Sequence, residues 1–290
     1  ITVFFISVWN GWVGYMPNMD ELSNPIDKFA SQVYSSDQQL IGTWNADNNN
    51  RVAIDYNGLS PHLVHALVAT EDERFYEHSG VDFIALGRAV VKRGVMGQAS
   101  AGGGSTITQQ LAKQLFSEKA HSTVERLLQK PIEWIIAVKL ERHFTKEEIL
   151  AMYFNYFDFL HNAVGIKRAA NVYFNKEPRK LTVTEAAMLV GLCKNPSMFN
   201  PLRYPERCKQ RRNVVLMQMV KSGYVTKAEY DELSQRPLGL HFTKAKPVSG
   251  AADYFQAYLR QYMMAKKPVR EDYQADRKST RLNSSHRSLS

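Results

Sequence analysis

Cysteine is scarce in this chain of 290 residues, which contains only Cys193 and Cys208. Two thiols exclude a disulfide framework and a zinc site built from four cysteines. The fold must therefore depend on an apolar core, and a hydrophobic content of 44% is enough for one large domain or two small ones. We interpret the two cysteines as small buried residues on helices.

A long apolar run is also lacking. Residues 1–16 are largely apolar, with Trp9, Trp12 and Tyr15 toward the end of the segment. A helix that crosses a bilayer needs about 20 apolar residues, so this run is short. The chain begins without a methionine, and we predict that residues 1–17 are the remnant of a transmembrane anchor with its aromatic residues at the interface. A buried N-terminal helix is the alternative.

Acidic residues are outnumbered by basic ones, and the formal net charge is +9. Residues 277–290 carry four of the positive charges and no acid, and they show no hydrophobic period. We predict that this stretch is a non-native tail. The remaining charge of +5 favours an anionic partner, such as a phosphate or a lipid surface, and no nucleic-acid partner is predicted.

Strand and turn signals dominate residues 18–58. Segments 32–34, 40–44 and 52–56 are short strand candidates, separated by turn residues. We therefore predict a β-containing linker here. Residues 246–276 are predicted to be a second linker.

Helical signals dominate the chain from Pro61 to about Arg236. Ser60 can cap a helix that has Pro61 at its first position. Capping boxes, in which a threonine pairs with a glutamate three residues later, begin three later helices at Thr145, Thr182 and Thr226. Gly223 is placed to end the helix before it. Residues 94–104 contain five glycines and predict a loop.

An acidic cluster follows the first of these helices, in residues 71–80 (EDERFYEHSG). Glu71 stands at the end of an apolar helix, with Phe75 and Tyr76 close by in the sequence. A carboxylate held against apolar neighbours can serve in acid–base catalysis. Charged helix ends are common, so a solvated surface is the other interpretation of this cluster taken alone.

A glycine-flanked polar segment lies in residues 102–116 (GGGSTITQQLAKQLF). Glycines let the backbone approach a ligand, and successive N–H groups can cradle an anion. The segment is not a Walker loop, because no Gly-Lys-Ser or Gly-Lys-Thr follows at the required spacing. A flexible linker before a polar helix is the alternative.

A third segment combines a buried stripe with a charged pair, in residues 126–141 (RLLQKPIEWIIAVKLE). Isoleucines and a leucine recur at helical spacing along it. Lys130 and Glu133 lie one turn apart on the same side, as in an ordinary surface pair or in a binding site. Pro131 predicts a kink or a helix start.

Together and in this order, the three segments resemble the peptidoglycan glycosyltransferases (family 51), found in class A penicillin-binding proteins and monofunctional transglycosylases. The family motifs read Glu-Asp-x-x-Phe-x-x-His-x-Gly, Gly-Gly-Ser-Thr-Ile-Thr-Gln-Gln-x-x-Lys and a third ending in Lys-x-x-Glu. A fourth, Tyr-x-Asn, matches residues 153–155, and a fifth matches residues 185–201. The resemblance covers about residues 59–222 and the anchor, and it implies a glycosyltransferase domain at residues 59–245.

The resemblance implies a mainly α fold, with a lysozyme-like helical lobe, a smaller membrane-proximal jaw lobe and a short β-containing N-terminal linker. The implied enzyme polymerises lipid II into β-1,4-linked glycan strands by inverting displacement of undecaprenyl pyrophosphate. The implied partners are lipid II, the growing lipid-linked strand, the membrane and a cell-wall synthesis complex. The implied location is the bacterial cytoplasmic membrane, with a single span and the catalytic domain on the periplasmic or extracellular side.

Site residues are carried over motif by motif. Glu71 matches the general base, and Glu133 matches the second acid, near the donor pyrophosphate or its metal, Mg²⁺ or Mn²⁺. Substrate-binding positions are implied at Asp72, Phe75, His78, Ser105, Thr106, Gln110, Lys113, Arg126, Lys130 and Asn155.

Rival interpretations account for less of the sequence. A lysozyme-like glycan hydrolase would also use a carboxyl group in a helical lobe, but it needs neither the basic second motif nor an anchor. A non-catalytic anchored scaffold gives no reason for the acids of the first and third motifs.

Transpeptidase activity is not expected. The Ser-x-x-Lys, Ser-x-Asn and Lys-Thr-Gly motifs of a serine transpeptidase are absent from the chain. Residues 246–276 resemble the lead-in to a missing transpeptidase domain, and a monofunctional enzyme is the alternative.

Overall fold

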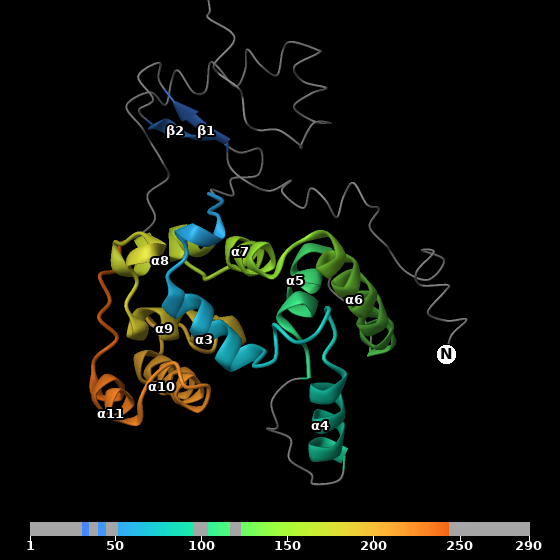
Figure 1. The fold of residues 1–290 in the computed structure, drawn as a ribbon. Coiled ribbons are helices and arrows are strands. Elements are labelled where there is room, and N and C mark those ends of the chain that lie inside the picture. Colours follow the sequence, from blue (N-terminus) through green and yellow to red (C-terminus); the bar gives the residue numbers. More distant parts are fainter. Residues whose placement is uncertain (1–30, 35–39, 45–51, 95–103, 117–122, 244–290) are drawn as a thin grey trace, which may run out of the picture.

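The structure is a computed structural model, and it describes residues 31–34, 40–44, 52–94, 104–116 and 123–243. Helices dominate these ranges, which confirms the predicted mainly α fold (Figure 1). The predicted anchor at residues 1–17, the linker at residues 246–276, the tail at residues 277–290 and most of the loop at residues 94–104 lie outside the described residues. None of the described helices combines the length and the apolar character needed to span a bilayer.

Two of the three predicted strands are present. Strand β1 (Ser31–Tyr34) pairs antiparallel with β2 (Leu40–Trp44), with Ser31 opposite Trp44. The strand predicted at residues 52–56 is wrong, because the chain there leads into the short 3₁₀ helix η1 (Tyr56–Gly58). The reason is that the N–H and C=O of Ile54 bond to the side chain of Asn155 instead of a neighbouring strand.

The helical part contains nine α-helices within the described ranges. They are α3 (Pro61–Glu71), α4 (Phe83–Gly94), α5 (Ile107–Phe116), α6 (Thr123–His143), α7 (Lys146–Tyr156), α8 (Ile166–Phe174), α9 (Val183–Lys194), α10 (Pro205–Lys221) and α11 (Lys227–Gln235). A second 3₁₀ helix, η2 (Pro178–Lys180), precedes α9.

Four predicted helix starts, at Ser60, Thr145, Thr182 and Thr226, are confirmed. The hydroxyl of Ser60 accepts the N–H of His62 at the start of α3, and Pro61 occupies the first turn. Complete capping boxes begin three further helices, at Thr145, Thr182 and Thr226.

Two further predictions concern Gly223, at the end of α10, and Pro131, inside α6. Gly223 follows the end of α10 in a left-handed conformation, with φ of 76°. Of the two alternatives predicted at Pro131, the helix start is wrong, because α6 begins at Thr123 and continues through the proline, and the kink stays a prediction. Beyond the proline, the apolar side chains Ile136 and Leu140 are fully buried, and this packing stabilises the rest of α6.

The core is built around α9, which packs against α3 and α10. All of its residues from Ala186 to Leu192 are buried, as expected for a helix that is apolar on every side. Helix α5 packs against α6 and α7, and α4 projects from the body beneath α5 in Figure 1. The end of α3 therefore lies between the α9–α10 side and the α5–α6 side of the molecule.

Candidate active site

Glu71 is the last residue of α3, and both of its carboxylate oxygens are engaged. The amide Nε2 of Gln110, on α5, donates to Oε2 at 3.0 Å. The Nη2 of Arg211, on α10, lies 3.4 Å from Oε1. The side chain of Glu71 is 14% exposed, so its carboxylate is largely shielded but still open on one side.

The orientation of Gln110 follows from Tyr153 on α7. The hydroxyl of Tyr153 donates to Oε1 of Gln110 at 3.0 Å, which leaves the NH₂ group to donate to Glu71. Burial, with smaller contributions from Cys193 and the charge of Glu71, raises the pKa of Tyr153 well above its usual range. The hydroxyl thus stays protonated and remains a donor.

Asp72, the next residue, joins the first motif to the second. Its carboxylate accepts the backbone N–H of Ile107 at the start of α5, at 3.0 Å. It also lies 3.0 Å from Nε2 of His78. The Nδ1 of His78 accepts the N–H of Gly80, so the ring proton sits on Nε2 and is donated to Asp72.

A cavity of about 770 Å³ opens on one side of Glu71. Four cationic side chains from four helices line it: Lys113, Lys130, Lys194 and Arg211. Its acids are Glu71 and Glu133. We call this the larger cavity, and its excess of positive charge suits an anionic ligand.

Lys130 and Glu133 form the tightest charged pair in the larger cavity. Their side chains are one turn apart on α6, with Nζ 2.6 Å from Oε2. Glu133 is only 3% exposed, whereas Lys130 is 48% exposed. The Nζ of Lys130 also reaches Oγ of Ser105 at 3.5 Å. The ammonium of Lys130 is therefore the member of the pair that faces an incoming ligand.

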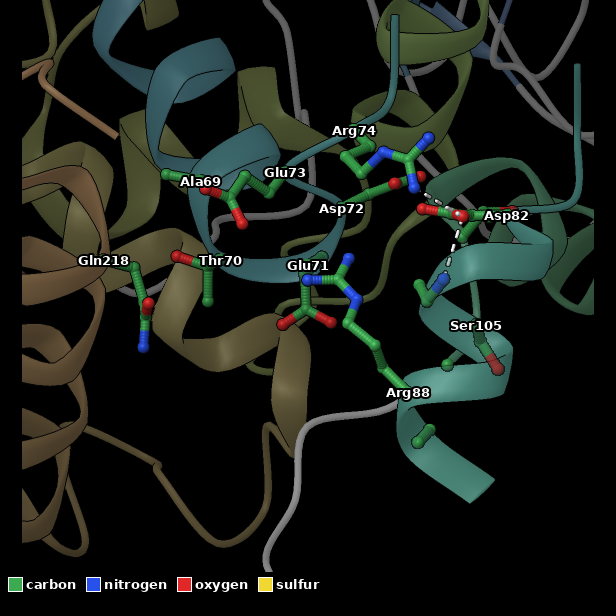
Figure 2. A pocket seen from close by; sticks show the side chains of 14 residues that line it. Ala69, Thr70, Glu71, Asp72, Glu73, Arg74, Asp82, Arg88, Ser105 and Gln218 are labelled. Carbon is green, nitrogen blue, oxygen red and sulfur yellow. Dashed lines mark hydrogen bonds and ion pairs between the residues drawn. The ribbon is translucent and has the colours of Figure 1, made fainter. Parts of the chain in front are cut away.

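A second cavity of about 310 Å³, the smaller cavity, lies on the other side of Glu71. Figure 2 shows Arg88 extending toward it from α4 and Gln218 from α10, with Arg74 and Asp82 paired at its edge. Four residues line both cavities: Thr70, Glu71, Ser105 and Gln218. Glu71 therefore stands where the two cavities meet.

Three buried polar atoms in the wall of the larger cavity have no hydrogen-bond partner among the residues that the structure describes. They are Oγ1 of Thr70, Oε1 of Gln114 and Nε of Arg211. An unpaired buried polar atom is costly, and native proteins keep few of them. Their gathering around one cavity indicates a place where a polar ligand completes the bonding.

Several predicted site residues lie away from both cavities. Phe75 is fully buried beneath the Nζ of Lys146, which sits 4.3 Å from the ring centroid. His78 is nearly buried and contacts Asp72 through its ring. The side chain of Asn155 bonds to the backbone N–H and C=O of Ile54. These three residues brace the segments that carry the site, and none of them lines a cavity.

Thr106 and Arg126 are two other predicted site residues. Thr106 lines the smaller cavity and donates from Oγ1 to the carbonyl of Gly80 at 2.6 Å. Arg126 belongs to α6, and its side chain lies outside what the structure describes.

Helix α10 supplies site residues that the sequence analysis missed. Arg211, Val214 and Gln218 line the larger cavity from one face of this helix. Their spacing of three and four residues is typical of a single helical face. That spacing was a usable signal, but only the packing of α10 on α3 indicates which face of α10 meets Glu71.

Comparison with known proteins identifies the family of the chain. The sequence model of the transglycosylase family matches residues 37–220. The chain is 37% identical to penicillin-binding protein 1A of Aquifex aeolicus (strain VF5), over 92% of this chain and 35% of that protein. It is 40% identical to penicillin-binding protein 1F of Bacillus subtilis (strain 168), over 72% of this chain and 28% of that protein.

A solved structure gives a weaker likeness. The crystal structure of penicillin-binding protein 1A from Haemophilus influenzae shares 23% identity, covering 83% of this chain and 25% of that chain, with a TM-score of 0.41. The chain spans about a third of the length of the curated relatives it matches. The family match over most of the chain and the identities of these relatives show that the chain belongs to the transglycosylase family, as the transglycosylase domain of a class A penicillin-binding protein.

Proposed function

We propose that this domain is a peptidoglycan glycosyltransferase that polymerises lipid II, with Glu71 as the general base. The observation that carries the proposal is the position of Glu71 at the junction of two cavities. A transfer between two sugars requires that both substrates meet at the base. The larger cavity, with its four cations, suits the donor and its pyrophosphate, and the smaller cavity suits the acceptor.

The chemistry needs one proton acceptor and a stabilised leaving group. Glu71 accepts the proton of the acceptor 4-hydroxyl as the hydroxyl oxygen bonds to C1 of the donor sugar. The bond from C1 to the pyrophosphate oxygen breaks, and the electron pair leaves with the pyrophosphate. Attack from the opposite face inverts the anomeric carbon and gives a β-1,4 link. Lys113 and Lys130 stabilise the growing negative charge, so no strong general acid is required.

The predicted Mg²⁺ or Mn²⁺ fits this site only as a companion of the substrate phosphates. In the part of the chain that the structure describes, no three His, Cys, Asp or Glu side chains lie together as metal ligands. Glu133 supplies one carboxylate, and Lys130 is already 2.6 Å from it. Mg²⁺ is often bound by one or two carboxylates together with substrate phosphates. We propose Glu133 as the single protein ligand, and no step above depends on the ion.

A lysozyme-like hydrolase is the alternative function. Such an enzyme pairs a carboxylic acid beside the leaving oxygen with a second carboxylate that acts on water or on the sugar. It has no use for four cations around the larger cavity, and no observation on this structure favours it.

Contact with a membrane is part of the proposal. Helix α4 exposes Phe83, Ile84 and Val91 at 71%, 59% and 53%. Apolar side chains at this exposure on a projecting helix fit the interface of a bilayer. We propose that α4 belongs to the membrane-proximal jaw and that the enzyme works on the outer side of the bacterial cytoplasmic membrane. A single-pass anchor and a complex of cell-wall synthesis proteins belong to the same proposal.

The test is polymerisation of lipid II in detergent by this chain and by Glu71→Gln. We expect glycan strands from the parent and a rate at least about 100-fold lower from the variant, because an amide cannot accept the proton. Glu77→Gln is the matched control, since Glu77 is exposed and lines neither cavity. Equal rates for Glu71→Gln and the parent, with both folded by circular dichroism, would overturn the proposal.

A further inference from the structure

Arg211 reaches the general base from 140 positions further along the chain. Its Nη2 lies 3.4 Å from Oε1 of Glu71, while Gln110 bonds to the other oxygen. The side chains of Arg211 and Glu71 are 15% and 14% exposed, so the pair is largely removed from water. An ion pair at this depth interacts more strongly than one on the surface.

The structure makes room for the Arg211 side chain at Gly191. A methyl group at Gly191, on α9, would come within 3.2 Å of Cγ of Arg211. On the other side, the guanidinium lies 5.9 Å from the ring centroid of Phe199. The Arg211 side chain therefore runs toward Glu71 between Gly191, which has no side chain, and the ring of Phe199 in the loop after α9.

The neighbouring arginine shows what a purely structural arginine looks like in this helix. Arg212 is 1% exposed, and its guanidinium donates to Oδ1 of Asn213 and to the carbonyls of Ser234 and Pro237. Within the described part of the chain, Arg211 has no such set of carbonyl partners, and its buried Nε has no hydrogen-bond partner. Arg212 therefore holds α10 against the end of α11 by hydrogen bonds. Arg211 instead forms an ion pair with Glu71.

We infer that Arg211 is a positioning residue that keeps Glu71 ionised and correctly aimed while an anionic donor occupies the larger cavity. The inference rests on the proposed function of Glu71. A pyrophosphate in that cavity would favour protonation of a nearby carboxylate, because like charges repel. Arg211 lines the same cavity and stands against the carboxylate, so it offsets that repulsion. With Gln110 on the other oxygen, it also restricts rotation of the carboxylate.

Other charged or titratable groups adjoin Glu71 in the chain, line the two cavities with it or interact with it electrostatically. They are Asp72 and Glu73 next to it, Arg88 of α4, Lys113 of α5, Lys130 and Glu133 of α6, Tyr153 of α7, and Cys193 and Lys194 of α9. The only direct ion pair of Glu71 within the described residues is with Arg211. Among single substitutions of these charged groups, we therefore expect the loss of the Arg211 guanidinium to affect the Glu71 carboxylate most.

The experiment compares Arg211→Gln, Arg211→Lys and Gly191→Ala with the parent, using steady-state lipid II polymerisation from pH 5 to pH 9. We expect Arg211→Gln to lower kcat by about 10- to 100-fold and to move the acid limb of the pH profile up by about one unit, with a smaller change in KM. Arg211→Lys keeps a cation and should recover part of both effects. Gly191→Ala, which displaces Arg211 without removing it, should shift the limb in the same direction by less.

Arg212→Gln is the matched control. It should lower the melting temperature and leave the acid limb where it is, because the side chain of Arg212 bonds to Asn213, Ser234 and Pro237, none of which lines either cavity. A rise in KM for Arg211→Gln with kcat and the acid limb unchanged would make Arg211 a substrate-binding cation and overturn the inference. Activity in Glu71→Gln would instead refute the proposed function, so the two failures are distinguishable. If Arg211→Gln is unstable, Arg211→Met serves in its place as a variant without the cation, and an unshifted acid limb in that variant overturns the inference.

Discussion

The carboxylate of Asp72 accepts the backbone N–H of Ile107, 35 residues further along the chain, at 3.0 Å. This bond holds the start of α5 against the end of α3. It thereby sets the relative position of Gln110 and Glu71, which lie one turn or less from the bonded residues. The side chain of Asp72 is 4% exposed, so both groups depend on each other for hydrogen bonding.

Removing that carboxylate should destabilise the fold. We expect Asp72→Ala to lower the free energy of unfolding by about 3 kcal/mol, because the N–H of Ile107 and the ring of His78 both lose their buried partner. Asp72→Asn keeps one acceptor oxygen and should cost less. Urea unfolding followed by circular dichroism measures the change. Asp231→Ala, at an exposed pair with Lys227, is the control and should change little.

Three glycines should respond differently to alanine. Gly80 has φ of 95°, and a methyl group there would lie 2.8 Å from the backbone of Ala137, so Gly80→Ala should cost at least about 2 kcal/mol. Gly223 has φ of 76° but open space around it, and about 1 kcal/mol is expected. Gly87 is helical, no atom of the described residues lies within 4 Å of an added methyl group, and Gly87→Ala should stabilise α4 by about 0.5–1 kcal/mol. Equal effects of Gly80→Ala and Gly87→Ala on urea unfolding would contradict this account.

The lysines of the larger cavity should contribute to anion binding. We expect Lys113→Gln to weaken binding of inorganic pyrophosphate about tenfold in isothermal titration calorimetry, which corresponds to about 1.4 kcal/mol. Lys130→Gln should weaken binding similarly and also lower stability, because it leaves Glu133 buried without its cation. The double variant Lys130→Gln, Glu133→Gln should regain stability but not affinity. Unchanged affinity in both single variants would rule out this cavity as the pyrophosphate site.

The cysteines should be unreactive in the folded protein. Burial raises the pKa of the Cys208 thiol to about 12, and burial with the nearby charge of Glu71 raises the pKa of Cys193 well above its usual range. Since the thiolate is the reactive form, both thiols should resist iodoacetamide at pH 8 and react in guanidinium. Mass spectrometry counts the labels. Glu71→Gln removes one cause of the shift, so Cys193 alone should label modestly faster in that variant.

Local features of this protein were predictable from sequence because their causes are local. Ser60, Thr145, Thr182 and Thr226 begin helices by bonding to backbone groups two or three residues away. The motifs around Glu71 and Glu133 likewise identified the acids of the site. The strand predicted at residues 52–56 failed because a distant residue, Asn155, takes the backbone groups that a strand would share.

The composition of the chain, its helical periodicity and its ordered motifs determined the mainly α class, most helix starts and the choice of Glu71 as the leading acid. Only the tertiary structure decided that Gln110 and Arg211 hold the two oxygens of Glu71. It also decided that Phe75, His78 and Asn155 brace the site from outside the cavities. The physical reason is that these contacts depend on how helices distant in sequence rotate and pack, down to the space that Gly191 leaves for one arginine.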